Sequence, residues 1–117
     1  DETALFISDT GASHAENGPK HIRKFNLGEK GQTLSESTVF AECSAGLFDG
    51  FRFDDAGRLW SSAADGVHCY DPDGTLIGKI LIPEMVANLC FGGAARNRLF
   101  IAGTTSLYAA YLNVNGA

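Results

Sequence analysis

Short apolar runs rich in Val, Ile, Leu, Phe and Tyr alternate with turn residues along the chain, and the spacing of amphipathic helices is nearly absent. This pattern predicts antiparallel β-structure. Residues 54–57 and 71–74 each place a Gly where a positive φ is commonly needed, which supports the breaks between strands. The expected strands are 3–8, 21–27, 37–42, 50–54, 59–63, 67–71, 76–82, 89–92, 99–102 and 106–112.

These strands repeat with a period of about 40 residues. The stretch 59–62 (Leu-Trp-Ser-Ser) recurs as 99–102 (Leu-Phe-Ile-Ala), and 66–70 recurs at the same interval as 106–110. A third copy starts upstream at 5–8 (Leu-Phe-Ile-Ser) and carries a longer insertion before its next strand. A four-stranded unit repeated at this interval is typical of β-propeller blades.

We therefore predict an all-β chain that forms a β-propeller fragment of about two and a half four-stranded blades. The blade pieces are residues 3–42, 49–82 and 88–112, so that 1–117 is one partial propeller domain. A closed propeller needs at least about four blades. We expect the open blade edges to be covered by a partner, and the expected partner is the missing remainder of the same propeller.

The composition fits a chain with a hydrophobic core, since 44% of the residues are apolar and 20% are charged. A net charge of -5 argues against binding to nucleic acid or to an anionic membrane surface, because both need a basic patch. No apolar run approaches the roughly 20 residues that span a bilayer, so we expect a soluble protein. No signal-like region follows Asp1, and the sequence leaves the compartment open between cytoplasm and periplasm.

Three cysteines without a C-x-x-C pair argue against a disulfide framework and against a zinc site. Cys69 and Cys90 lie in apolar strand-like runs, and we expect buried free thiols. Structural roles are also expected for three other residues. Asp54 lies in a hairpin turn, Trp60 alternates with polar positions as a core residue does, and His68 has no carboxylate or serine partner in the local pattern.

Several motifs occur in combination along nearly the whole chain. They are LFISDT at 5–10, HIRKF at 21–25, DGFRFD at 49–54, GRLWSS at 57–62, DPDG at 71–74, NLCFGG at 88–93 and TTSLY at 104–108. Together they resemble the C-terminal part of the gluconolactonase / senescence marker protein (regucalcin) family. The resemblance implies a six-bladed propeller that hydrolyses a sugar lactone or a similar ester, with a divalent metal in its central channel.

The resemblance also implies a metal site of three protein ligands, a Glu, an Asn and an Asp that opens an inner strand. Asp49 matches the last of these, and the other two would precede Asp1. The resemblance implies that this metal is most commonly Ca²⁺, a hard cation that prefers oxygen ligands, with Zn²⁺, Mn²⁺ and Mg²⁺ left open. Asp49 is thus the expected metal ligand and, as general base, the expected catalytic residue. The 117-residue chain alone is expected to be inactive.

Two further residues are candidates for binding the lactone substrate. Asn88 opens the next blade, where its amide either contacts substrate or caps its own backbone. His14 lies in the insertion at 11–20, together with Glu16 and Asn17. In a propeller this loop lies on the same face as the start of the inner strand and can overhang the channel mouth. The alternative is an exposed loop of variable length.

Two competing functions remain at this point. The stretch Asp9-Thr10-Gly11 after an apolar strand resembles the catalytic loop of aspartic proteases, which would act as a dimer with two Asp sharing a proton. This interpretation leaves the 40-residue repeat unexplained. The other competitor is a non-catalytic propeller fragment.

Overall fold

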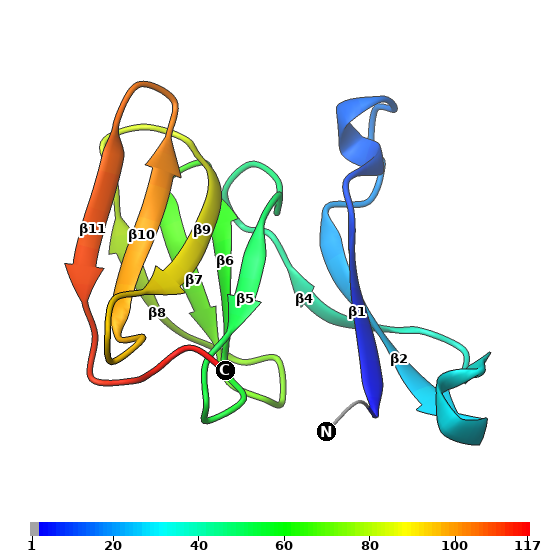
Figure 1. The fold of residues 1–117 in the computed structure, drawn as a ribbon. Coiled ribbons are helices and arrows are strands. Elements are labelled where there is room, and N and C mark those ends of the chain that lie inside the picture. The colour runs from blue at the N-terminus through cyan, green and yellow to red at the C-terminus, as the bar shows by residue number, and fades with distance from the viewer. Residues whose placement is uncertain (1–2) are drawn as a thin grey trace.

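The computed structural model describes residues 3–117, which form three antiparallel β-sheets side by side (Figure 1). The first sheet contains β1 (Ala4–Asp9), β2 (His21–Gly28), β3 (Thr33–Leu34) and β4 (Thr38–Glu42). The second contains β5 (Phe51–Phe53), β6 (Leu59–Ala63), β7 (Gly66–Tyr70) and β8 (Leu76–Leu81). The third contains β9 (Val86–Gly92), β10 (Arg98–Gly103) and β11 (Leu107–Tyr111). Two short 3-10 helices, η1 (Gly11–Ser13) and η2 (Glu29–Gly31), flank β2.

The second and third sheets are meanders in which consecutive strands pair. The second sheet has the order β5-β6-β7-β8 and the third the order β9-β10-β11. In the first sheet β2 lies between β1 and β4, and β3 pairs with the last residues of β2. Antiparallel meanders need only short connections, which the Gly-rich turns supply.

The all-β prediction is confirmed. All ten expected strands are present, and their ends differ from the expected ones by at most three residues. The largest difference is at β9, which starts at Val86 rather than at residue 89. The two-residue strand β3 and both 3-10 helices were not expected. Within residues 3–117 no helix has the length and hydrophobicity that crossing a membrane requires.

Gly74 shows how a turn of one blade fits against its neighbour. Its φ is +89°, a left-handed conformation that favours glycine. A Cβ here would also collide with the carbonyl oxygen of Phe40 in the first sheet. The turn at residues 71–74 therefore packs directly against β4. Glycine is required at position 74 because of its positive φ and because of this close approach.

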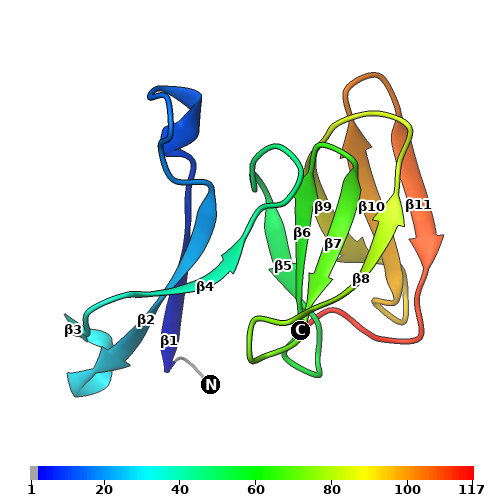
Figure 2. The same cartoon turned by 180° about the vertical axis from the view of Figure 1, so that it is seen from behind.

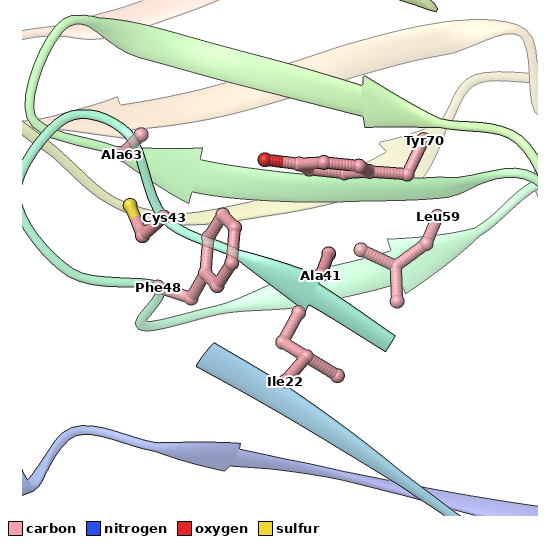
Figure 3. Close-up of a cluster of buried hydrophobic side chains, with 7 residues drawn as sticks. All are labelled: Ile22, Ala41, Cys43, Phe48, Leu59, Ala63 and Tyr70. Carbon is pink, nitrogen blue, oxygen red and sulfur yellow. The ribbon is translucent and has the colours of Figure 1, made fainter. Parts of the chain in front are cut away.

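Two hydrophobic cores hold the three sheets together. The first lies between the first and second sheets, and Figure 3 shows Ile22 of β2 below Ala41 and Phe48. Its buried members are Ile22, Ala41, Cys43, Phe48, Leu59, Ala63 and Tyr70. The second core lies between the second and third sheets and contains Val67, Val86, Leu89, Leu99 and Ile101. The second sheet is thus covered on both faces, as each blade of a closed propeller is.

Trp60 belongs to the second core, as expected. Its ring packs edge-to-face against Phe91 of the third sheet, with the ring centroids 6.2 Å apart. Such pairs add stability beyond the burial of their surface. The indole Nε1 donates a hydrogen bond to Asp54, so the side chain is satisfied at both its apolar and its polar end.

The expected burial of the cysteines is correct for Cys69 and wrong for Cys90. Cys43 and Cys69 are buried, and burial raises the thiol pKa of both, that of Cys69 to about 11. Cys90 is exposed. It follows buried Leu89 on β9, and alternate side chains of a strand point to opposite faces. Cys90 therefore lies on the face of the third sheet that no other described sheet covers.

The outer faces of the first and third sheets carry exposed apolar side chains. On the first sheet Ile7 and Val39 are 44% and 52% exposed. On the third sheet Leu107 and Tyr111 are 72% and 74% exposed. Among the strands of residues 3–117, β1 and β11 also lie at sheet edges and pair on one side only. Faces and edges of this kind are normally covered by another sheet or by a partner.

Candidate functional site

The connections that carry the candidate site residues gather at one end of the sheets. Figure 1 shows the β1–β2 loop, the segment before β5, the β8–β9 loop and the β10–β11 turn together at the top. The view from behind in Figure 2 shows the same grouping. The loop at 11–20, the segment of Asp49 and the start of β9 therefore lie at one end of the blades, as the sequence predicted.

A pocket of ≈ 440 Å³ opens at this end, and all three sheets contribute to its wall. Its lining residues are Thr10, Gly46, Leu47, Phe48, Asp49, Ala64, Met85, Val86 and Ala87. Thr10 follows β1, Ala64 follows β6, and Val86 begins β9. Among the residues described as lining the pocket, Asp49 alone has an ionisable side chain. The pocket wall thus contains one carboxylate residue, Asp49, and one hydroxyl residue, Thr10, among apolar residues and a glycine.

The Asp49 carboxylate and the Asp49 backbone are in opposite situations. The side chain is exposed, and it makes no hydrogen bond or ion pair with any residue between 3 and 117. The backbone around it is fixed by all three sheets. Ser8 Oγ donates to the carbonyl of Phe48 at 2.6 Å, Asp49 N donates to Ser62 Oγ at 3.1 Å, and Gly50 N donates to the carbonyl of Ala87 at 3.0 Å. An exposed carboxylate without a described partner therefore projects from a backbone segment that hydrogen bonds to three sheets hold in place.

Asn88 lies beside the Asp49 segment but does not line its pocket. A Cβ at Gly50 would collide with the Asn88 side chain, so the two inner strands approach closely here. The amide oxygen of Asn88 accepts a hydrogen bond from the Leu89 backbone N–H at 2.8 Å. This is the capping contact that the sequence left as the alternative. The exposed Asn88 lines a second, smaller pocket with Arg52 and Phe100.

His14 directly follows η1 in the β1–β2 loop. Its backbone N–H donates to the Gly11 carbonyl at 3.0 Å, which closes the short helix. Its imidazole is exposed and contacts no described residue through a hydrogen bond. Thr10 at the base of the same loop lines the Asp49 pocket. The base of the loop therefore lies at the same end of the blades as the Asp49 pocket.

The Asp9-Thr10-Gly11 motif belongs to the base of that loop. Asp9 Oδ1 accepts a hydrogen bond from Gly11 N at 3.3 Å, and its other oxygen lies 3.7 Å from His21 Nε2. The carboxylate organises the turn after β1. Antiparallel sheets that pack face to face through two hydrophobic cores are the architecture of propeller blades, and this architecture excludes an aspartic-protease fold.

The expectation that His68 lacks a carboxylate partner is wrong. Its Nε2 lies 2.6 Å from Asp65 Oδ1, and Lys79 Nζ lies 3.1 Å from Asp65 Oδ2. Desolvation opposes ionisation of Asp65, but the hydrogen bonds from His68 and Lys79 outweigh it and lower its pKa. Asp65 lies in the β6–β7 turn, three residues before His68 of β7. The alternation of side chains along a strand does not predict a contact at this spacing.

Glu84 forms a second polar cluster that the sequence did not indicate. Its carboxylate accepts hydrogen bonds from the backbone N–H groups of Thr105 and Ser106, from the Thr105 hydroxyl and from Tyr108 OH. Desolvation is again outweighed by these bonds, and the pKa of Glu84 is lowered. The cluster ties the β8–β9 loop to the β10–β11 turn beside the pocket residue Met85.

Within residues 3–117 no three His, Cys, Asp or Glu side chains come close enough together to hold a metal ion. An exposed carboxylate such as that of Asp49 suits a hard cation as one ligand. If a hard cation were bound here, Asp49 could supply only one of its oxygen ligands.

Three antiparallel sheets packed face to face, with Asp49 in the wall of the pocket at one end, define part of a β-propeller. The chain belongs to the SMP-30/Gluconolactonase/LRE-like family, whose family model matches residues 1–105. The family assignment made from the motifs is thereby confirmed.

Proteins named as lactonases are similar to this chain in sequence or in structure. The chain is 29% identical over 113 residues to a gluconolactonase of Zymomonas mobilis, covering 89% of this chain and 30% of that protein. It is 33% identical over 85 residues to a pentonolactonase of Haloferax volcanii, covering 68% of this chain and 29% of that protein. The solved structure of a gluconolactonase from Xanthomonas campestris superposes with a TM-score of 0.79 at 32% identity, and the match covers 100% of this chain and 35% of that protein. The chain thus spans about a third of the length of these proteins.

Proposed function

We propose that this chain is the part of a propeller lactone hydrolase that carries the Asp49 side of the active site. The observation that supports this most is the contrast at Asp49, an exposed carboxylate without a partner in residues 3–117 on a backbone held by three sheets. A group placed in this way is preorganised to act on a bound molecule. The substrate class is a sugar lactone, after the names of the relatives.

A divalent cation in the channel, most simply Ca²⁺, would supply positive charge that polarises the lactone carbonyl and acidifies a nearby water. Asp49 would be one of its anionic ligands. In the reaction Asp49 takes a proton from the water as its oxygen attacks the lactone carbonyl carbon. The ring C–O bond then breaks, and the proton passes to the leaving ring oxygen, so that the product is the open hydroxy acid. Thr10 and Met85 of the pocket wall would border the substrate, and we propose Asn88 and His14 as substrate contacts from the neighbouring strand and loop.

The activity needs more of the propeller than these three sheets. One carboxylate is too small a donor set for a cation that takes about six to eight oxygens, waters and substrate included. The exposed apolar residues of the outer faces, such as Ile7 and Leu107, support further blades on both sides. We propose that these blades belong to the same propeller and supply the remaining ligands.

The test compares a complete propeller that carries this chain with the 117-residue chain alone, each checked by intact mass. We expect the complete propeller to hydrolyse gluconolactone, to lose this activity in a metal chelator and to regain it when a divalent cation is added back. The chain alone should show no turnover above the uncatalysed rate.

Turnover by the chain alone would mean that the ligand set is assigned wrongly. A complete, folded propeller without activity on any sugar lactone, with or without metal, would contradict the proposed function and would favour a non-catalytic role.

A further inference from the structure

Two serines at the same position of successive blades hold the Asp49 segment. The repeat aligns Ser8 at the end of 5–8 with Ser62 at the end of 59–62. In the structure Ser8 Oγ donates to the Phe48 carbonyl at 2.6 Å. Ser62 Oγ accepts hydrogen bonds from the backbone N–H groups of Asp49 and Gly50, both at 3.1 Å. One hydroxyl thus binds the carbonyl side of this segment and the other binds its amide side.

The two contacts are unlike ordinary strand pairing. Asp49 precedes β5 (Phe51–Phe53), so its amide lies outside the strand ladder. Among the described residues Ser62 Oγ is the sole acceptor recorded for the Asp49 N–H. The Gly50 N–H, in contrast, has a second acceptor in the Ala87 carbonyl. Loss of the Ser62 hydroxyl would therefore act on Asp49 more than on any other residue.

The third copy of the repeat shows that folding of a blade does not require a hydroxyl here. The aligned residue of the third sheet is Ala102, in the stretch 99–102. A small residue is sufficient to build the inner strands at this position. The hydroxyl occurs in the sheet that precedes the Asp49 segment and in the sheet that this segment opens, and Ala102 stands at the aligned position of the third sheet. That distribution follows the site rather than the fold.

Ser61 gives a built-in comparison one residue away. Ser61 and Ser62 are both 0% exposed. Ser61 Oγ donates to the Ser62 carbonyl at 3.3 Å and makes no recorded contact with the Asp49 segment. Both serines are buried and lie on β6, but only Ser62 forms hydrogen bonds with the backbone of the Asp49 segment.

We propose that Ser8 and Ser62 are positioning residues that fix the backbone of Asp49 and thereby aim its carboxylate into the pocket. This inference rests on the proposed role of Asp49 in lactone hydrolysis. Catalysis depends steeply on placement, and a shift of about 1 Å at a reacting group can cost ~10²-fold in rate. Neither serine needs to touch the substrate, so their loss should lower kcat more than it raises KM.

The test uses the complete propeller and the variants Ser62→Ala, Ser8→Ala, Ser8→Thr and Ser61→Ala, with Asp49→Asn as reference. We expect Ser62→Ala to lower kcat by about 10- to 100-fold. Ser8→Ala should have a smaller effect in the same direction, and Ser8→Thr, which keeps the hydroxyl, should restore activity. Ser61→Ala removes an equally buried hydroxyl that does not contact the Asp49 segment, and it should keep parental kcat.

Hydrogen exchange of the peptide that covers residues 48–50 gives a readout independent of activity. The Asp49 amide should exchange faster in Ser62→Ala and not in Ser61→Ala, because only the first change removes its acceptor. If Ser62→Ala does not fold, the half-buried Ser8 pair of variants still decides the matter.

Parental kcat and parental exchange in Ser62→Ala, alongside an inactive Asp49→Asn, would overturn the positioning role and leave the proposed function intact. Equal losses in Ser61→Ala and Ser62→Ala would likewise overturn it, since a general packing effect would then explain both. Full activity of Asp49→Asn would instead overturn the proposed role of Asp49.

Discussion

The two ends of β5 carry the same residue type in opposite settings. Asp49 precedes the strand at the pocket end, is exposed, and its carboxylate has no partner within residues 3–117. Asp54 follows the strand at the other end and is 1% exposed. Its oxygens accept hydrogen bonds from the backbone N–H groups of Ala56 and Arg58 and from Trp60 Nε1. Arg58 also lies within ion-pair distance, at 3.5 Å.

This difference separates a structural acid from a candidate functional one. A buried charge is tolerated when hydrogen bonds and an opposite charge satisfy it, as they do at Asp54. Its partners belong to one turn and one sheet, so the carboxylate stabilises the β5–β6 hairpin. At Asp49 the hydrogen bonds go to the backbone instead, and the carboxylate is left available. Substitutions at the two ends should therefore separate activity from stability.

The largest effect is expected from Asp49→Asn in the complete propeller. The change keeps the size of the side chain and one oxygen but removes the charge that a hard cation prefers and the group proposed as general base. Loss of a positioned general base typically lowers the rate by ~10²–10⁴-fold. We expect kcat to fall by this order and metal affinity to fall with it, at an unchanged Tm. Steady-state kinetics and calorimetric metal titration measure both quantities. Parental kcat with unchanged metal affinity would make Asp49 an ordinary turn residue.

Asp54→Asn is the matched change at the other end of the strand, and its effect should fall on stability. An amide NH₂ in place of one oxygen would face a backbone or indole N–H, leaving a buried donor without an acceptor. Such a donor costs about 1–3 kcal/mol. We expect a lower free energy of unfolding in denaturant titrations and near-parental kcat for the fraction that remains folded. A large loss of kcat without loss of stability would remove the distinction between the two ends.

The fold could be predicted from the sequence because its signals are local and repeated. Alternating apolar residues and Gly-containing turns define the strands, and the echo of 59–62 in 99–102 defines the blade interval. Burial of a particular side chain is a different matter, since it depends on which neighbouring sheet is present. Cys90 has the same strand pattern as Cys69 but lies on an uncovered face, and the pattern cannot distinguish these cases.

The candidate site was only partly accessible to sequence reasoning. Asp49 was predicted from the family motif and from its place before an inner strand, and its role stays a prediction. The contacts of Ser8 and Ser62 were not found, although the repeat aligns the two residues, because a small residue at a strand end is usually packing. The Asp65–His68 pair was missed because a hairpin turn changes the spacing at which side chains meet.

Asp65 provides the smallest and last test, because it is an acid at the pocket end that does have partners. It follows Ala64 of the pocket wall, and its oxygens contact His68 and Lys79. Its folded-state pKa is lowered from the ordinary value of 3.8, so its stabilisation is fully present above this value. The stabilisation is lost as the pH falls through the lower, folded-state pKa. Because the side chain is 36% exposed, solvent screens these contacts, and we expect at most about 1 kcal/mol.

Thermal melts of the parent and of Asp65→Asn between about pH 3 and pH 7 measure this contribution. The Tm difference should be constant in the upper part of the range and should shrink as the pH falls below 3.8. Asp55→Asn at the opposite end of the sheet is the control, since its exposed carboxylate has no recorded ion pair with the described residues and should not affect the profile. If Asp65→Asn lowers stability but leaves kcat unchanged, the feature that distinguishes Asp49 from the structural acids is that its carboxylate has no partner among the described residues. If Asp65→Asn instead lowers kcat as Asp49→Asn does, the proposed site must be extended to the β6–β7 turn, because nearness to the pocket would then matter more than freedom of the carboxylate.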